Sequence, residues 1–302
     1  MTFLSVIIAA HNAALTLPAT LESLVLAVDS AFVDVEVIIL NDASDDETQS
    51  IIEAWSSRLP GAVTAEVAWR NVGQVRNHAV SLAKGQYITM LDSDDLLKPG
   101  SLRDAVGFLR QHQPDMLLTH LLEIRDMAKI TSEWQGFSPI SLTSHEAIRR
   151  FLIHKDFQAH LIGQFIHRDL YQKKAIPPMS CYEDFAVFPT MLSKASKIFF
   201  QRDGHYYYIK RQGSLSNALD AEKITLLVDC TLSMESVFPA IFKPLINCHW
   251  LDIYTNHKQR LTSLQLETVK QRIDGLYSWR FFFAKDVRFS YKKRAIKALW
   301  KK

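Results

Sequence analysis

The sequence has little cysteine, with only Cys181, Cys230 and Cys248 among 302 residues. These cysteines are odd in number, far apart and without the spacing of metal ligands, which excludes a disulfide framework and a cysteine-based zinc site. We therefore expect free thiols in a reducing compartment. No stretch approaches the roughly 18 uninterrupted apolar residues of a membrane-spanning helix, so no such helix is expected.

A strong charge of one sign is also missing. Lys and Arg total 35 against 32 Asp and Glu, and the net charge of +3 is too small to indicate a nucleic-acid partner. The N-terminus MTFLSVIIAA has no positive leader and only a short apolar run, so it is typical of a buried strand rather than a signal peptide. We expect a cytoplasmic protein, or one attached peripherally to the cytosolic face of the inner membrane.

The first hundred residues alternate between strand and helix patterns. Residues 4–9 and 35–40 are nearly continuous apolar runs, as in strands covered on both faces. Helical spacing of Leu and Val follows, and further strands are expected at 63–69 and 87–91. This order predicts an α/β fold with a mostly parallel sheet flanked by helices.

An acidic cluster, Asp92-Ser93-Asp94-Asp95, follows the last of these strands. Ligands of such sheets bind beyond the carboxyl ends of the strands, where His11, Asn12 and Asp42 are also expected. Carboxylates so close together repel each other unless a cation offsets their charge. Oxygen-only ligands favour Mg²⁺ or Mn²⁺, which bind carboxylates together with substrate phosphates. A helix cap is the alternative for an isolated D-x-D.

Six segments resemble, in the correct order, motifs of the inverting glycosyltransferases of family 2, which have the GT-A fold. They are SVIIAAHNA, EVIILNDASDDET, NVGQVRNHAVSLAKGQYITMLDSDD, QFIHRDLYQKKAI, CYEDFAVFPTML and HYYYIKRQGSLS, and they cover roughly residues 3–217. The resemblance implies a metal-dependent hexosyl transfer from a nucleotide-sugar, most simply UDP-linked. The implied acceptor is a hydroxyl of a bacterial surface glycan, free or lipid-linked, such as lipopolysaccharide or capsule.

The resemblance also implies roles for single residues. Donor binding is expected of Ala9, His11, Asn12, Asp42, Arg76, Asp92, Ser93, Lys210 and Arg211. In this set Asp42 meets the nucleoside, Asp92 faces the ribose, and Lys210 and Arg211 lie near the diphosphate. Asp94 is the expected ligand of Mn²⁺ or Mg²⁺, with Asp92 and His205 as further candidates, although a packing role is the alternative for His205.

Catalysis is expected of the acid pair Glu183-Asp184, with Asp184 as the general base. The alternative for Asp184 is an N-terminal helix acid favoured by the helix dipole. The second motif departs from the usual D-D-G-S-x-D of the family, because Asn41 and Ala43 stand where an acid and a glycine are usual.

We expect a GT-A domain over residues 1–215 and a helical C-terminal region over 216–302. The domain divides into a nucleotide-sugar-binding part, 1–100, and an acceptor part, 101–215. The last 24 residues, 279–302, carry nine Lys or Arg against one acid, Asp286, interleaved with aromatic residues. Such basic amphipathic helices bind anionic membrane surfaces. A packing helix with a solvated basic face, or a subunit contact in a homo-oligomer, is the alternative.

Three rival functions differ in the sequence features that they require. A sugar nucleotidyltransferase needs a glycine-rich basic loop after the first strand, and AAHNAALT has neither feature. A non-catalytic scaffold that binds a glycan or nucleotide-sugar would keep the same fold. A membrane-recruitment protein would act through the C-terminal stretch alone.

Overall fold

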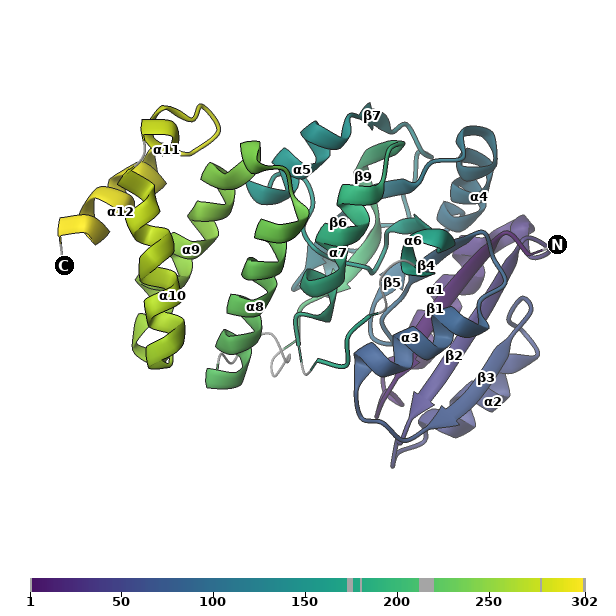
Figure 1. Cartoon of the computed structure of the whole chain (residues 1–302). Coiled ribbons are helices and arrows are strands. Elements are labelled where there is room, and N and C mark those ends of the chain that lie inside the picture. Colours follow the sequence, from purple (N-terminus) through teal and green to yellow (C-terminus); the bar gives the residue numbers. More distant parts are fainter. Residues whose placement is uncertain (1, 173–175, 180, 212–219, 278, 301–302) are drawn as a thin grey trace.

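The computed structural model describes residues 2–172, 176–179, 181–211, 220–277 and 279–300 (Figure 1). The strands are β1 (Leu4–Ala10), β2 (Val35–Asp42), β3 (Val63–Val67), β4 (Tyr87–Met90), β5 (Leu96–Leu97), β6 (Met116–Ile124), β7 (Ile140–Leu142), β8 (Phe165–His167) and β9 (Ile198–Ile209). The helices of the first part are α1 (Leu17–Val28), α2 (Thr48–Ser56), α3 (Val72–Leu82), α4 (Ser101–His112), α5 (Ser144–Leu152), α6 (Arg168–Gln172) and α7 (Glu183–Lys194). Those of the C-terminal part are α8 (Ala221–Val237), α9 (Lys243–His257), α10 (Ser263–Asp274), α11 (Trp279–Phe283) and α12 (Phe289–Trp300).

One sheet runs through the described part of the chain in the order β3-β2-β1-β4-β8-β6-β9-β5, and β7 also pairs with β9. The first four strands in this order are mutually parallel, as the sequence predicts. Beyond β4 the sheet is mixed, because β8 runs antiparallel to both β4 and β6 while β6 and β9 are parallel. The parallel half therefore ends at β4, directly before the acidic cluster.

The predicted strands are central because both of their faces are covered. Every residue of β2 is buried, and so are six of the seven residues of β1. Helix α3 packs on β1 and β2, and α1 packs against α2 and α4. The continuous apolar runs at 4–9 and 35–40 are thus explained by helices on either side of the sheet.

The C-terminal helices lie at the end of the molecule opposite β1, β2 and β3 (Figure 1). Helix α9 packs against α8, α10 and α12, which makes a helical extension as the sequence predicts. The domain boundary at residue 215 remains a prediction, since it falls at 212–219, outside the described residues.

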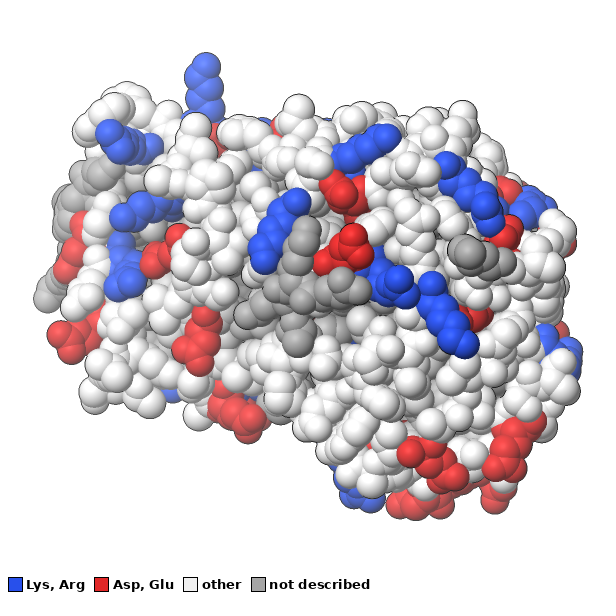
Figure 2. All heavy atoms as spheres, turned by 45° about the vertical axis from the view of Figure 1, so that its right-hand side comes forward, with Lys and Arg blue, Asp and Glu red and all other residues white. Residues whose placement is uncertain are grey.

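Two expectations about composition can be compared with the structure. All three cysteines are free thiols. Among the described residues, no helix has both the length and the apolar character to cross a membrane. On the face shown in Figure 2, both Lys or Arg and Asp or Glu side chains reach the surface.

Candidate active site

The loops after β1 and β2 are tied to each other. The ring nitrogen Nδ1 of His11 lies 2.6 Å from the carbonyl oxygen of Asp42. The backbone N–H of Asn12 donates to the Ser44 hydroxyl at 3.0 Å, and the Asn12 side-chain oxygen accepts the N–H of Asp45 at 2.9 Å. Adjacent parallel strands bring their carboxyl ends to one edge of the sheet, and these contacts hold the polar loops there.

The carboxylate of Asp42 accepts three consecutive backbone N–H groups. Trp69 and Arg70 donate to its Oδ1 at 2.7 and 2.8 Å, and Asn71 donates to its Oδ2 at 2.9 Å. Arg70 has a left-handed φ of 47°, which lets successive N–H groups converge on one anion. A carboxylate offers about four acceptor positions, so these three contacts leave about one for a further hydrogen-bond donor. Asp42 is 4% exposed.

At Ala43, where the family motif usually has glycine, the backbone adopts a conformation that favours glycine. Ala43 adopts a φ of 51°, in the left-handed region that costs an L-residue roughly 1–2 kcal/mol and costs glycine almost nothing. Its N–H still donates to the carbonyl of Val67 at 2.8 Å, so the turn is kept. The amide of Asn41 donates to Gln49 at 3.0 Å and its oxygen accepts the Ser44 hydroxyl, which gives Asn41 a structural role.

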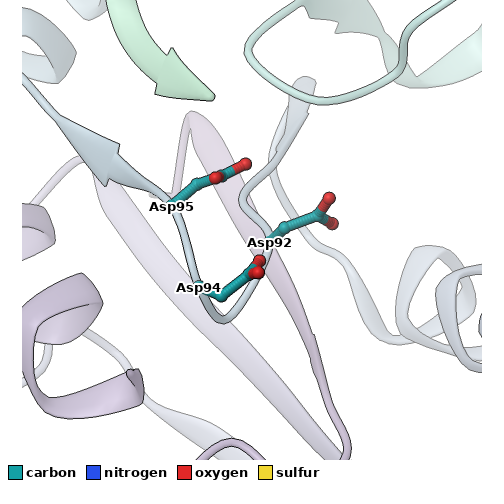
Figure 3. Close-up of side chains that lie close together, drawn as sticks. All are labelled: Asp92, Asp94 and Asp95. Atoms are coloured by element: carbon teal, nitrogen blue, oxygen red, sulfur yellow. The ribbon is translucent and has the colours of Figure 1, made fainter. Parts of the chain in front are cut away.

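The acidic cluster brings Asp92, Asp94 and Asp95 together, with one carboxylate oxygen of each within 4.8 Å of the others (Figure 3). Asp95 is fully buried and accepts the Tyr206 hydroxyl at 2.7 Å and the N–H of Ile209 at 2.8 Å. The same Tyr206 oxygen accepts the N–H of Asp92 at 3.0 Å. Burial, together with the charge of Asp92, raises the pKa of Asp95. Asp95 therefore shapes the loop, and Asp92 and Asp94 keep carboxylate oxygens for a ligand.

Asp94 is half-exposed and pairs with Arg211. Burial and the charge of Asp92 raise the pKa of Asp94, and the Arg211 guanidinium opposes this. The Arg211 contact uses one Asp94 oxygen, and no other residue of the described part of the chain contacts the second, which can bind a cation. Two carboxylates that each keep a free oxygen fit Mg²⁺ or Mn²⁺, which complete their shells with waters and substrate phosphates.

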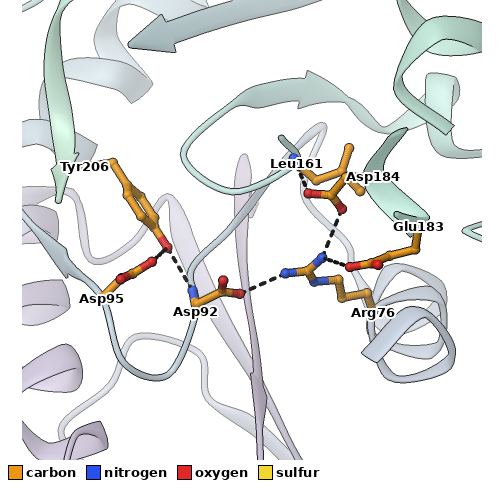
Figure 4. A network of polar contacts seen from close by, with 7 residues as sticks. All are labelled: Arg76, Asp92, Asp95, Leu161, Glu183, Asp184 and Tyr206. Atoms are coloured by element: carbon orange, nitrogen blue, oxygen red, sulfur yellow. Dashed lines mark hydrogen bonds and ion pairs between the residues drawn. The ribbon is translucent and has the colours of Figure 1, made fainter. Parts of the chain in front are cut away.

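The guanidinium of Arg76 joins Asp92 to the acid pair on α7 (Figure 4). It lies 2.8 Å from Asp92, 2.9 Å from Glu183 and 3.0 Å from Asp184, and Arg76 is 5% exposed. The other oxygen of Asp184 accepts the N–H of Leu161 at 3.0 Å. Burial disfavours the charge of Arg76, but the three carboxylates outweigh it and hold the pKa of Arg76 above its usual range.

The two acids at the start of α7 differ in their surroundings. Burial raises the pKa of Asp184, and the neighbouring Arg76 charge opposes this. Burial also raises the pKa of Glu183, and the charge of Asp184 adds to the increase. A raised pKa makes a carboxylate a stronger base, which suits proton abstraction near neutral pH. Tyr182, with a left-handed φ of 62°, turns the chain into α7 directly before the two acids.

Three further predicted residues make contacts of their own. Lys210 lies 3.5 Å from Glu123 and 4.8 Å from the Tyr208 ring centroid. Ala9 is half-buried in β1, and Ser93 accepts the Thr16 hydroxyl at its carbonyl oxygen.

His205 is not at the acidic cluster, which corrects its assignment as a metal-ligand candidate. Its ring stacks on Phe165 with centroids 5.2 Å apart and lies among Trp134 and Phe137. Side chains alternate across a strand, so the neighbour of Tyr206, which meets Asp95, faces the opposite side of the sheet. Burial lowers the pKa of His205 to about 3, so its ring is neutral.

Two contributors to the site were not predicted from the sequence. Tyr206 lies within a recognised motif, but its hydroxyl gave no sign that it would join Asp92 to Asp95. The N–H of Leu161 orients Asp184. Every residue except proline has a backbone N–H, so the type of residue at position 161 does not reveal this contact.

The chain belongs to glycosyl transferase family 2, whose model matches residues 5–172, more than half of its length. It is 26% identical to the poly(ribitol-phosphate) β-N-acetylglucosaminyltransferase TarS of Staphylococcus aureus over 212 residues, which are 69% of this chain and 36% of TarS. It is 33% identical over 109 residues to the UDP-Glc:α-D-GlcNAc-diphosphoundecaprenol β-1,3-glucosyltransferase WfaP of Escherichia coli, covering 36% of this chain and 42% of WfaP.

The fold also matches a solved structure. The crystal structure of S. aureus TarS 1–349 in complex with UDP-GlcNAc has a TM-score of 0.71 and 19% identity, covering 90% of this chain and 81% of that one. The predicted family and the GT-A-type α/β fold are thereby confirmed. The chain spans about a third of the length of TarS.

Replacing Arg76 by Met should lower the free energy of unfolding by roughly 3–5 kcal/mol at neutral pH, because three carboxylates lose their shared cation. Without the guanidinium, the pKa values of Asp184 and Glu183, which burial already raises, rise further. An acid whose pKa is higher in the folded protein binds its proton on folding. The variant should therefore regain stability as the pH falls below neutral, measured by urea unfolding across a pH series.

Arg103→Met is the matched control, since Arg103 also contacts two carboxylates, Asp29 and Asp104, but is exposed. It should leave the unfolding free energy nearly unchanged. An Arg76→Met protein as stable as the Arg103→Met protein, at every pH, would contradict the role given to the buried network.

Proposed function

We propose that this chain is an inverting, metal-dependent hexosyltransferase that moves a sugar from a nucleotide-diphosphate sugar, favouring UDP, to a hydroxyl of a bacterial surface glycan. The main support is the ion network of Arg76, which joins the D-x-D acid Asp92 to the acid pair of α7. TarS and WfaP are named as sugar transferases acting on poly(ribitol-phosphate) and on a diphosphoundecaprenol-linked sugar. These names support a surface glycan, free or lipid-linked, as the acceptor.

The donor lies across the carboxyl ends of β1, β2 and β4 in this proposal. The remaining acceptor position of Asp42, with Ala9, His11 and Asn12 beside it, meets the nucleoside. Asp92 and Asp94 hold Mn²⁺ or Mg²⁺, and a cation bound there stabilises the charge that develops on the leaving diphosphate. Arg211, next to Asp94, adds a second positive charge on the same side.

Asp184 accepts the proton of the acceptor hydroxyl. The hydroxyl oxygen forms a bond to the anomeric carbon from the face opposite the diphosphate, whose bond to that carbon breaks, so the configuration inverts. Arg76 and the N–H of Leu161 each occupy one position on a different oxygen of Asp184. Each carboxylate oxygen keeps one lone-pair position that can take up the incoming proton. The two contacts together fix the orientation of the Asp184 side chain.

Asp184→Asn should retain donor binding within about threefold and lower transfer by roughly 10²–10⁴-fold, since the amide has the same shape but cannot take up the proton. Donor affinity is measured by calorimetry and transfer by release of nucleoside diphosphate. Asp34→Asn is the control, because Asp34 pairs with Arg110 away from the site. Near-normal transfer by Asp184→Asn would remove Asp184 from the mechanism. A wild-type chain that binds donor without ever releasing nucleoside diphosphate would instead be the scaffold.

Asp94→Ala, or chelation with EDTA, should abolish turnover, and added Mn²⁺ should restore it after chelation but not after the substitution. The reason is that Asp94 keeps a free carboxylate oxygen at the acidic cluster. Asp169→Ala, at an exposed acid beside His167, is the control and should behave as wild type. Full activity in chelator would exclude a metal requirement.

The C-terminal helices expose an apolar and cationic surface that supports contact with an anionic membrane. Its apolar members are Trp279, Phe283, Phe289 and Ile296, exposed by 69, 78, 80 and 48%. On α12, Lys293 and Lys297 share the face of Phe289, while Ala295 and Ala298 are buried on the opposite side. Asp286, the one acid of the stretch, pairs with Arg149 at 2.7 Å. Aromatic residues among cations favour an anionic lipid surface.

The double variant Phe289→Ser, Ile296→Ser should weaken binding to vesicles containing phosphatidylglycerol by about 10-fold or more, because burial of these side chains is lost. Binding of the wild type should fall with added salt and be weak on pure phosphatidylcholine vesicles. Leu264→Ser, at a residue of α10 that is 75% exposed, is the control. Equal vesicle binding by both variants would exclude the membrane surface. Loss of a dimer in light scattering without any vesicle binding would favour the subunit contact.

A further inference from the structure

The acidic cluster is a tight turn whose two ends lie close together. The backbone N–H of Asp95 donates to the carbonyl of Asp92 at 3.1 Å, which closes a four-residue turn. Asp94, the proposed metal ligand, stands inside this turn (Figure 3). A change in the shape of the turn therefore changes the distance between the carboxylates of Asp92 and Asp94.

The hydroxyl of Tyr206 contacts both ends of the turn (Figure 4). It accepts the N–H of Asp92 at 3.0 Å and donates to Oδ2 of Asp95 at 2.7 Å. A tyrosine hydroxyl has one proton to donate and lone pairs to accept with, so it makes both contacts at once. One oxygen atom thus joins the first residue of the turn to the last.

Asp95 is the fixed end of this arrangement. Its Oδ2 accepts the Tyr206 hydroxyl, and its Oδ1 accepts the N–H of Ile209 at 2.8 Å. Asp95 is fully buried, whereas the side chains of Asp92 and Asp94 are 33% and 45% exposed. Asp95 therefore anchors the turn to the protein, and the other two carboxylates are the ones that an ion from solvent can reach.

The anchoring contacts come from one strand, β9. Tyr206 and Ile209 both belong to it, and β5, which follows the turn directly, pairs with it antiparallel. The middle of the turn has a separate support, because the Thr16 hydroxyl donates to the carbonyl of Ser93 at 3.0 Å. The N–H of Asp92, by contrast, has the Tyr206 hydroxyl as its acceptor. The start of the turn therefore depends on this one side chain.

Tyr206 acts on the turn without taking part in the chemistry of the site. It is fully buried, and it contacts the backbone of Asp92 rather than the carboxylate, one oxygen of which pairs with Arg76. Removal of the hydroxyl would loosen the turn and leave the carboxylates of Asp92 and Asp94 chemically as they are.

We propose that Tyr206 is a positioning residue of the metal site, whose hydroxyl holds both ends of the turn and so sets the affinity of Asp92 and Asp94 for Mn²⁺ or Mg²⁺. The inference rests on the proposed function, because it presupposes the metal. It adds a residue that contacts neither the metal nor a substrate. Loss of a group that orients metal ligands through hydrogen bonds typically lowers metal affinity by about 10–100-fold, since the ligands are no longer held in place.

Tyr206→Phe tests the inference, because it removes one oxygen atom and keeps the ring. Binding of Mn²⁺ to the full chain in the presence of UDP is measured by electron paramagnetic resonance, with a protein-free sample to correct for Mn²⁺ held by UDP in solution. The dissociation constant for Mn²⁺ should rise roughly 10-fold or more. Raising the Mn²⁺ concentration should restore most of the release of nucleoside diphosphate, unlike in Asp94→Ala, which lacks the ligand itself.

Tyr207→Phe is the matched control, at the neighbouring position of the same strand. Tyr207 is also buried, and its hydroxyl also donates one hydrogen bond and accepts another, to the carbonyl of Thr131 at 2.6 Å and from the Thr131 N–H at 3.1 Å. These contacts hold the loop between β6 and β7 instead of the acidic cluster. Both variants should lose similar stability in urea unfolding, and Tyr207→Phe should bind Mn²⁺ as the wild type does.

Four outcomes would overturn the inference. They are unchanged Mn²⁺ affinity in Tyr206→Phe, an equal loss of affinity in Tyr207→Phe, a rate that excess Mn²⁺ does not restore, and a Tyr206→Phe protein that does not fold. In the last case the hydroxyl would serve the whole fold rather than the turn.

The wild type in the same experiments separates these outcomes from failure of the proposed function. A wild type that binds no Mn²⁺ would remove the metal requirement. A wild type that binds Mn²⁺ and donor but releases no nucleoside diphosphate would remove the transferase activity. If the wild type does both, unaltered Mn²⁺ binding by Tyr206→Phe removes the positioning role alone.

Discussion

The buried guanidinium of Arg76 is the contact on which the candidate site depends. Asp92 comes from the end of β4, and Glu183 and Asp184 from the start of α7, so three acids from distant parts of the chain meet in a buried space. Like charges at such distances in a medium of low dielectric repel strongly, and a shared cation is what permits their approach. By joining the strand-end loop to α7, the same ion network also sets the distance between the proposed donor side of the site and the proposed base, Asp184.

The sequence predicts the sheet and the family well, because each of them follows from a pattern in nearby residues. The apolar runs at 4–9 and 35–40 mark β1 and β2 because both faces of those strands are covered, and the ordered motifs identify the family. Patterns of this kind do not record which side chains meet across long stretches of chain. Arg76 was expected near the nucleotide, yet its partners lie 16 to 108 residues away and are all acids. His205 shows a different error, since strand alternation from Tyr206 would have placed its ring on the opposite face.

Backbone geometry accounts for many of the site features that the sequence patterns do not predict. Asp42 was assigned to the nucleoside by analogy, but the structure shows it bound first by three N–H groups around the left-handed Arg70. Ala43 and Tyr182 also have left-handed φ values, and each lies next to a proposed site residue. Non-glycine residues in this region cost free energy that surrounding contacts must offset, and such strain concentrates at functional sites. Residue identity alone does not reveal it, because alanine and tyrosine are common in strands and helices.

The ion pairs also suggest a sequence for the proposed reaction, in which a cation binds before Arg211 contacts the diphosphate. Arg76 is committed to three partly buried acids and is itself only 5% exposed, so it is not available to a leaving diphosphate. Arg211 differs, because its partner Asp94 is half-exposed and holds it through one contact. A cation bound by Asp92 and Asp94 would take over the charge that Arg211 now neutralises. The guanidinium would then be released to pair with phosphate oxygens, where planar bidentate contacts are favoured. One arginine thus maintains the geometry of the acids, and the other would respond to the donor in the proposed reaction.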